Sequence, residues 1–219
     1  MLQLQSPYPQ IHQTGTLSYG GSQMWSENEM VKKCGCGIVA AQDLLLYLQR
    51  KHGMLPNAPS PLSLKAYNEE VLHLNHRYFP LLPHLGLNGL MLTVGINRLF
   101  REKALPYQAR WAFSGAKLWN RIREMLTNDI PVILSVGPNF PGIWENNCLD
   151  FYVKSRSGTY LRSTATKAHY VTATGMDEEW LRISSWGREY FINRAAYMDY
   201  VRRHSTYLFS NILYIRPKA

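Results

Sequence analysis

Cysteine is scarce in this chain of 219 residues, which contains Cys34, Cys36 and Cys148 and no others. An odd and sparse set argues against a disulfide framework and fits a reducing compartment or a reactive thiol. Long apolar runs are also missing, because no stretch approaches the roughly 20 residues that span a bilayer. The first 30 residues contain no apolar segment of the kind that forms a secretory signal. We therefore expect a cytoplasmic protein with no membrane partner.

Acidic residues are outnumbered, since 15 Asp and Glu stand against 24 Lys and Arg and the formal net charge is +9. A positive charge of this size attracts acidic partners over long distances. The basic residues occur singly or in pairs, and no basic tract with interleaved aromatic residues is present to follow a phosphate backbone. We expect no nucleic-acid partner, whereas a peptide or protein substrate of acidic character agrees with the charge.

Most sequence motifs of enzymes are absent as well. The chain has no P-loop, no Gly-x-Gly-x-x-Gly after a strand, no His-Glu-x-x-His and no carboxylate pair in a glycosidase context. The pair Cys34-x-Cys36 invites a zinc hypothesis, with a further ligand from His73, His76 or His84. Zinc sites of this type usually show two paired clusters at defined spacings, which this chain lacks. We expect neither a metal nor a cofactor.

The clearest secondary structure is a helix that begins after Gly37 and ends at Gly53. Apolar residues recur there at helical spacing, namely Ile38, Ala41, Leu45 and Leu48. The polar stripe between them is narrow, which is typical of a helix buried on most of its surface; it consists of Gln42, Asp43, Gln49 and Arg50. The abrupt change from a polar, Gly-rich beginning indicates that residues 1–22 form an extended N-terminal arm.

The rest of the pattern predicts an α+β fold in one domain over residues 1–219, acting as a monomer. Further helices are predicted at 64–77, 89–103, 116–127 and 194–204. Strands are predicted at 107–113, 130–136, 158–164, 169–175, 180–185, 188–192 and 211–216. Proline-rich connectors are predicted at 56–61 and 80–83. Because helices come first and an antiparallel sheet comes last, the order is that of α+β proteins.

Three features in a fixed order carry the chemistry. Cys36 lies between two glycines at the start of the buried helix, where free backbone N–H groups and the helix dipole lower a thiol pKa. His169 opens a strand 133 residues later, and Ser184-Ser185-Trp186-Gly187 follows it. A thiol nucleophile needs a base, a group that orients the base and donors for an oxyanion. This order favours thiol chemistry over a structural role for the cysteine.

These residues resemble the papain-like cysteine peptidase superfamily, in which the last element reads Asn-Ser-Trp-Gly. The Cys-Gly step is most similar to that of the bacterial double-glycine leader peptidases. The resemblance implies a helical half that carries the Cys helix, packed on an antiparallel sheet half, with the active-site cleft between them. It implies that Cys36 is the nucleophile, His169 the base and Trp186 the shielding indole. It places Ser184 at the position of the orienting residue.

Two positions depart from that family pattern. Asn or Asp normally orients the histidine, so Ser184 is either a weak third member, or another group takes its role, or the pair acts as a Cys-His dyad. The oxyanion glutamine normally lies about six residues before the cysteine, where this chain has Met30. Gln23 is the nearest upstream glutamine and is our oxyanion candidate, with Asn28 as its rival. Cys34 is the less favoured alternative nucleophile, because Gly37 would then weaken the first helical turn.

The sequence therefore predicts a cysteine peptidase or amidase that works through an acyl-enzyme. An acyltransferase with the same thioester intermediate is one alternative. A catalytically degenerate papain-like module that binds acidic partners is another, supported by the positive charge and by Ser184. The loop over residues 138–144 contains Phe140 and Trp144, which either form a cleft wall for the substrate or pack structurally. Cys148 is predicted to lie in a polar loop without a functional role.

Overall fold

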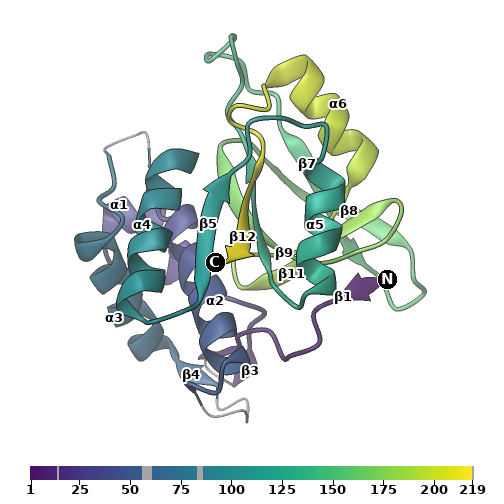
Figure 1. The fold of residues 1–219 in the computed structure, drawn as a ribbon. Coiled ribbons are helices and arrows are strands. Elements are labelled where there is room, and N and C mark those ends of the chain that lie inside the picture. Colours follow the sequence, from purple (N-terminus) through teal and green to yellow (C-terminus); the bar gives the residue numbers. More distant parts are fainter. Residues whose placement is uncertain (14, 56–60, 83–85, 219) are drawn as a thin grey trace.

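The computed structural model describes residues 1–13, 15–55, 61–82 and 86–218. Within these ranges the chain forms a mixed α+β fold, which confirms the predicted class. Four helices come first, and Figure 1 shows them together on one side of the sheet. They are α1 (Glu29–Cys34), α2 (Cys36–Lys51), α3 (Leu64–Arg77) and α4 (Gly89–Glu102). Two later helices, α5 (Leu118–Thr127) and α6 (Arg194–His204), pack against the sheet itself.

A large, mainly antiparallel sheet forms the second half of the fold. Its strands are β5 (Tyr107–Trp111), β6 (Val132–Val136), β7 (Leu149–Lys154), β8 (Tyr160–Thr166), β9 (His169–Met176), β10 (Trp180–Ser185), β11 (Arg188–Asn193) and β12 (Ile212–Pro217). They are ordered β5-β12-β6-β9-β10-β11-β7-β8, and β1 (Leu2–Gln3) pairs with β9 off this path. The central strand β9 therefore lies between β6 and β10, with His169 opposite Val136.

The helix α2 joins the two halves. Residues 37–48 are all buried, as its narrow polar stripe predicts, and the helix packs against β9 and β6. Gly35 ends α1 and begins α2. A Cβ added at Gly35 would lie 2.4 Å from the carbonyl oxygen of Val31, one turn earlier in α1, so only glycine fits at this end of the helix. The junction fixes Cys36 as the first residue of the buried helix.

The N-terminal arm is not a free extension, because it packs on the body of the protein. Tyr8 and Ile11 are buried in the core. Short strands β2 (Ile11–Gln13), β3 (Thr16–Leu17) and β4 (Leu62–Ser63) form a small separate sheet. The sequence analysis missed these strands together with α1, β1 and β7, since most of them are short and only weakly periodic. Residues 56–60 and 83 of the predicted connectors lie outside the described residues. Of the second connector, Leu82 forms an isolated bridge with Gly86.

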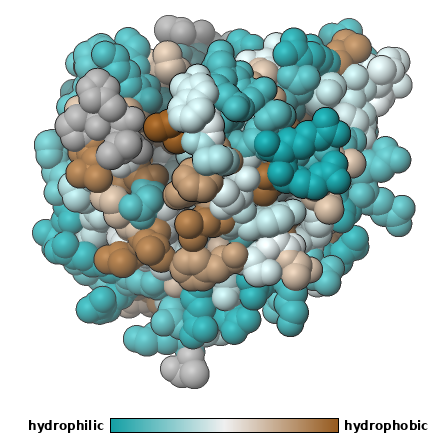
Figure 2. All heavy atoms as spheres, turned by 90° about the horizontal axis from the view of Figure 1, so that it is seen from above, coloured by the Kyte–Doolittle hydropathy of each residue, from teal (hydrophilic) through white to brown (hydrophobic). Residues whose placement is uncertain are grey.

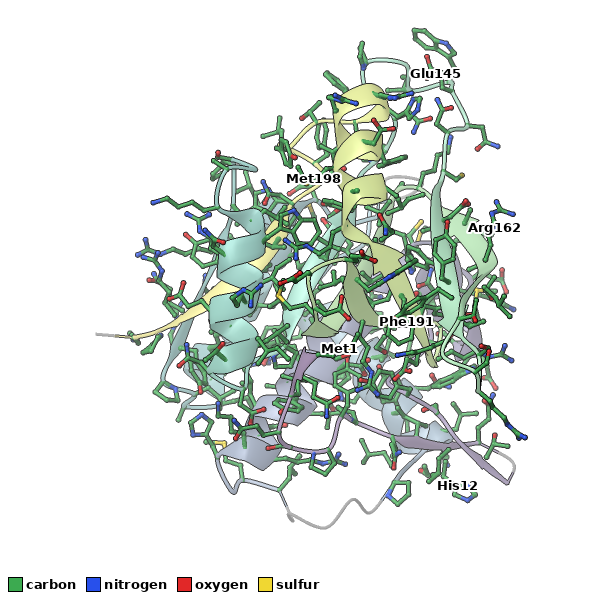
Figure 3. The ribbon with its side chains drawn as sticks, turned by 90° about the vertical axis from the view of Figure 1, so that its right-hand side faces the viewer. Met1, His12, Glu145, Arg162, Phe191 and Met198 are labelled. Carbon is green, nitrogen blue, oxygen red and sulfur yellow. The ribbon has the colours of Figure 1, made fainter. Side chains whose placement is uncertain are left out.

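No helix in the described ranges is both long enough and apolar enough to cross a membrane. The face seen from above in Figure 2 has hydrophilic side chains around its rim, and hydrophobic side chains gather toward its helical side. The loop between β6 and β7 projects at this end. Figure 3 shows Glu145 of that loop at the top of the molecule, beyond α6 and far from His12.

Candidate active site

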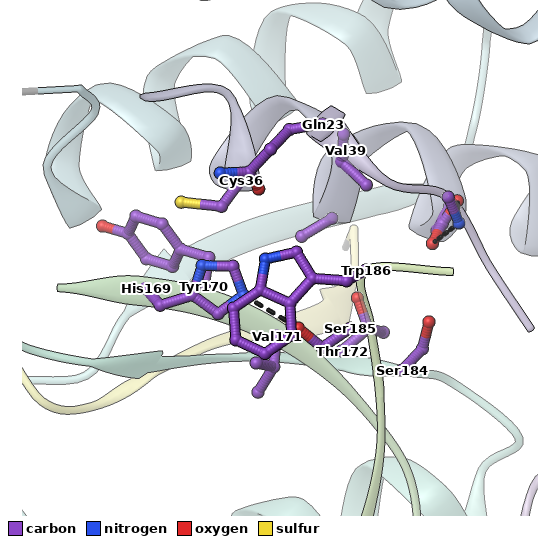
Figure 4. Close-up of a pocket in the computed structure, with 13 residues that line it drawn as sticks. Gln23, Cys36, Val39, His169, Tyr170, Val171, Thr172, Ser184, Ser185 and Trp186 are labelled. Carbon is purple, nitrogen blue, oxygen red and sulfur yellow. Dashed lines mark hydrogen bonds between the residues drawn. The ribbon is translucent and has the colours of Figure 1, made fainter. Parts of the chain in front are cut away.

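Residues from both halves of the fold meet at one cavity beneath the start of α2. Its walls contain the three side chains predicted for thiol chemistry, Gln23, Cys36 and His169, together with Ser185 and Trp186. Figure 4 shows the Gln23 side chain extending toward Cys36, with the His169 ring on the opposite side of the sulfur. The cavity has a volume of about 10 Å³, which is room for about one water molecule.

His169 is held on two sides. It is the first residue of β9 and is buried. Its Nε2 atom lies 2.8 Å from the hydroxyl oxygen of Ser185. The Trp186 indole stacks on the imidazole, with ring centroids 4.4 Å apart and an angle of 16° between the planes. Figure 4 shows the other ring nitrogen directed toward Cys36. Trp186 therefore covers the histidine as the resemblance implies.

The orienting contact expected from Ser184 is made by its neighbour, so that assignment is corrected. The two serines end β10, and successive side chains of a strand point to opposite faces. Ser185 faces His169, whereas the Ser184 hydroxyl donates a hydrogen bond of 2.8 Å to the carbonyl oxygen of Tyr19. The spacing to the Trp-Gly step pointed to Ser184. Because side chains alternate along β10, Ser185 is the serine that faces His169.

The electrostatics of the pair also differ from the expectation. Burial raises the pKa of the Cys36 thiol to about 11, an effect larger than the opposing hydrogen bonds from the backbone N–H groups of Tyr170 and Gly37. Burial likewise lowers the pKa of His169 to about 3. Both shifts favour uncharged groups. The resting pair is therefore a neutral thiol beside a neutral imidazole, and the helix dipole does not give Cys36 a low pKa.

The structure brings Cys36, and not Cys34, to the cavity, because Cys34 is the last residue of α1. Gln23 lies in the 3-10 helix η1 (Gln23–Trp25) and is buried at the cavity wall. Its rival Asn28 has another task. The Asn28 side-chain oxygen accepts hydrogen bonds of 3.0 Å from the backbone N–H groups of Met30 and Val31, and so caps α1.

Other candidates lie apart from this site. Among the described residues, no group of three or more His, Cys, Asp and Glu side chains is arranged to hold a metal ion, and His84 lies outside them. Cys148 is exposed. In the loop after β6, Phe140 packs on Phe209 with ring centroids 5.4 Å apart, and Trp144 is 81% exposed. Trp144 therefore forms no wall of the cavity beside Cys36.

Asp43 also lines the cavity, and the sequence analysis missed it. It lies seven residues after Cys36, which is two helical turns and therefore the same face of α2. Its side chain is 2% exposed. An aspartate within an otherwise apolar helix face was the available signal, but the sequence analysis treated it as part of the polar stripe.

Comparisons of this chain with protein families, with curated proteins and with solved structures found no match.

Proposed function

We propose that this protein is a papain-like cysteine hydrolase that cleaves a peptide or amide bond through an acyl-enzyme on Cys36. One observation carries the proposal: Cys36, His169 and Gln23 line a single cavity, with His169 held between Ser185 and Trp186. The cavity lies where the helical half meets the sheet half, which agrees with the position of a papain-like cleft. The positive net charge favours acidic peptides as substrates.

The hydrogen bond to Ser185 determines which nitrogen of His169 is the base. For the nitrogen facing Cys36 to accept the thiol proton, Nε2 must carry the ring proton and donate it to the Ser185 hydroxyl. As the sulfur bonds to the substrate carbonyl carbon, its proton passes to His169. The carbonyl oxygen takes up the negative charge, and the Gln23 amide N–H group donates a hydrogen bond to it.

Collapse of this intermediate breaks the bond to the leaving amine, which takes the proton from His169. A thioester with Cys36 remains. Water then attacks the thioester and gives its proton to His169, which returns it to the sulfur as the acid product leaves. Because burial makes both resting groups neutral, proton transfer accompanies attack on the carbonyl rather than preceding it.

The chemical test uses two probes of the thiol. Iodoacetamide should alkylate Cys36 near neutral pH in a reaction that His169→Ala slows by about a hundredfold, because a positioned base is worth about that factor. p-Nitrophenyl acetate should release one nitrophenolate per protein in a burst that Cys36→Ala abolishes. His12→Ala, which changes an exposed histidine of β2, is the matched control and should leave both reactions unchanged.

The pH profile adds a second readout. In His169→Ala the alkylation rate should rise about tenfold per pH unit from neutral pH toward the thiol pKa of about 11, since the thiolate then forms by ionisation alone. The wild-type rate should rise less steeply. Equal labelling of all three cysteines, with no effect of His169→Ala, would contradict the proposal. Acetyl transfer to added amines in preference to water would assign the site to an acyltransferase.

A further inference from the structure

Gln23 opens the short helix η1 and follows residues 19–22, which have no regular structure, so other contacts must hold its side chain beside Cys36. We call residues 19–23 the Gln23 segment. Both halves of the fold bind it. From the sheet side, the Ser184 hydroxyl donates to the carbonyl oxygen of Tyr19, and the Gly187 N–H group donates to that of Gly21 at 2.8 Å. The Tyr19 N–H group returns a bond of 2.9 Å to Gly187.

From the helical side, a single carboxylate holds the same segment. The Gly21 N–H group donates to both oxygens of Asp43, at 3.0 and 3.2 Å. Tyr67 of α3 donates to Oδ1 at 2.8 Å, and Tyr8 of the N-terminal arm donates to Oδ2 at 3.3 Å. All four bonds converge on a side chain that lies on the Cys36 face of α2. The helix α2 therefore both carries Cys36 and binds the Gln23 segment through Asp43.

Within the segment, Gly20 and Gly21 lie too close to the surrounding residues for either position to carry a side chain. A Cβ at Gly20 would lie 2.2 Å from the Ser184 hydroxyl oxygen and 2.5 Å from Asp43 Oδ2. One at Gly21 would lie 1.8 Å from the Tyr67 hydroxyl oxygen. Gly20 also has a φ of +73°, where glycine is favoured. The Gly20-Gly21 step is thus shaped to bring backbone N–H against the carboxylate.

A buried carboxylate at this position carries a desolvation penalty that a neutral side chain would not. None of the ion pairs between described residues includes Asp43. Burial raises its pKa to about 6, so the group is ionised at neutral pH in spite of the desolvation penalty. The facing tyrosines Tyr8 and Tyr67 have pKa values raised well above normal and stay neutral as donors. An uncharged side chain would avoid this penalty, which favours a functional reason for the carboxylate.

We propose that Asp43 is a positioning residue for the oxyanion site: its carboxylate fixes the Gly20-Gly21 step and thereby holds the Gln23 amide beside Cys36. The inference rests on the proposed function and assigns Asp43 a role within the same site. Ser184 supports the segment from the sheet side. Asp43 touches no reacting atom in this scheme, so its effect passes entirely through Gln23.

Two probes separate this role from a structural one. Attack on p-nitrophenyl acetate builds an oxyanion, whereas displacement of iodide from iodoacetamide does not. Asp43→Asn should slow acylation of Cys36 by about tenfold or more. Removal of an oxyanion donor lowers the rate by about a hundredfold, and displacement of the donor should cause part of that loss. The same variant should alkylate within about twofold of the wild-type rate. Gln23→Ala should show the same selective loss.

A double variant tests the route of the effect. If Asp43 acts through Gln23, then Gln23→Ala combined with Asp43→Asn should acylate no more slowly than Gln23→Ala alone. Asp129→Asn is the matched control, because Asp129 is another buried carboxylate that accepts bonds from a tyrosine and a backbone N–H group, away from the cavity. It should leave the ratio of acylation to alkylation unchanged.

Each outcome decides one question. Equal slowing of both reactions by Asp43→Asn, or additive losses in the double variant, would overturn the positioning role while leaving the hydrolase proposal intact. An unchanged acylation rate in Asp43→Asn would overturn it as well. If the wild-type protein shows no burst that depends on Cys36, the proposed function itself fails.

Discussion

Two adjacent serines at the end of β10 have different partners. Ser185 contacts His169, and Ser184 contacts the backbone of the Gln23 segment. Both lie in the cavity wall and both are buried. Both side chains are hydroxyls. A difference in reaction rate between the Ser184→Ala and Ser185→Ala variants therefore reflects the different contact that each variant loses. The pair is therefore a natural internal comparison for the two supports of the site.

We expect Ser185→Ala to slow alkylation by iodoacetamide and acylation by p-nitrophenyl acetate by about fivefold each. The reason is that His169 loses the hydrogen bond that fixes its tautomer, a contact worth about 1 kcal/mol. Ser184→Ala should slow acylation alone, since it loosens the Gln23 segment and leaves the base oriented. Rapid-mixing measurements of both reactions on the two variants check this. The reverse pattern would return the orienting role to Ser184.

At the scale of elements, the junction of α1 and α2 controls where the nucleophile lies. Gly35 ends one helix and begins the next, and its φ of −84° is open to any residue. The obstacle to a side chain is the Val31 carbonyl oxygen and not the backbone conformation. Gly37, two residues later, presents a looser environment, with the nearest side-chain atoms of Tyr170 and Leu87 at 3.2 and 3.3 Å.

Gly35→Ala should therefore lower the free energy of unfolding by about 1–3 kcal/mol, the usual penalty of overpacking, and should slow acylation as Cys36 shifts. Gly37→Ala is the matched comparison. Its extra methyl group meets only movable side chains and improves helix propensity by up to about 1 kcal/mol, so stability should hold or rise. Urea unfolding of the two variants measures the difference. Equal stability of both would show that the Gly35 contact relaxes without penalty.

The long periodic elements could be predicted from sequence, whereas the contacts between them could not. Helical spacing identified α3 at Leu64–Arg77 with its observed bounds, and the Cys36 helix with an error of one or two residues at each end. Short strands such as β2 carry too few residues for a period to appear. The proposed nucleophile Cys36 and base His169 were identified from local motifs, and Gln23 was identified as the nearest upstream glutamine. Ser185 and Asp43 were missed because their roles depend on the face of a strand and on chain segments far away in sequence.

At the scale of the whole molecule, Asp129 ties three parts of the chain together. It lies in the turn between α5 and β6. Its carboxylate accepts hydrogen bonds from the Gln5 N–H group at 2.7 Å, from the Ser6 hydroxyl at 3.2 Å and from the Tyr47 hydroxyl of α2. Burial acts to raise the pKa of Asp129, but these bonds outweigh it and the pKa is lowered. The folded protein therefore prefers the ionised form.

This preference has a definite sign in pH. Since the folded pKa lies below the unfolded one, the stabilisation is complete above about pH 4 and is lost as pH falls through the folded value. Asp129→Asn removes it, so the stability of the wild type should fall more steeply in acid than that of the variant. Asp129→Ala should lose about 2–3 kcal/mol at neutral pH, because the tyrosine and amide donors are left unpaired. Urea unfolding between neutral and acidic pH measures both effects, and parallel curves for wild type and Asp129→Asn would contradict the assignment.

The Gln23 segment lies between the sheet and the Cys36 helix and is bonded to both. Any motion that parts the two halves must break at least one of these sets of bonds. If the site acts as proposed, separation of the two halves would also displace Gln23 from its place beside Cys36. A thiol in the open form would meet electrophiles without an aligned donor for the oxyanion. Under the proposed function, the segment would therefore confine acyl transfer to the molecule in which the two halves are in contact.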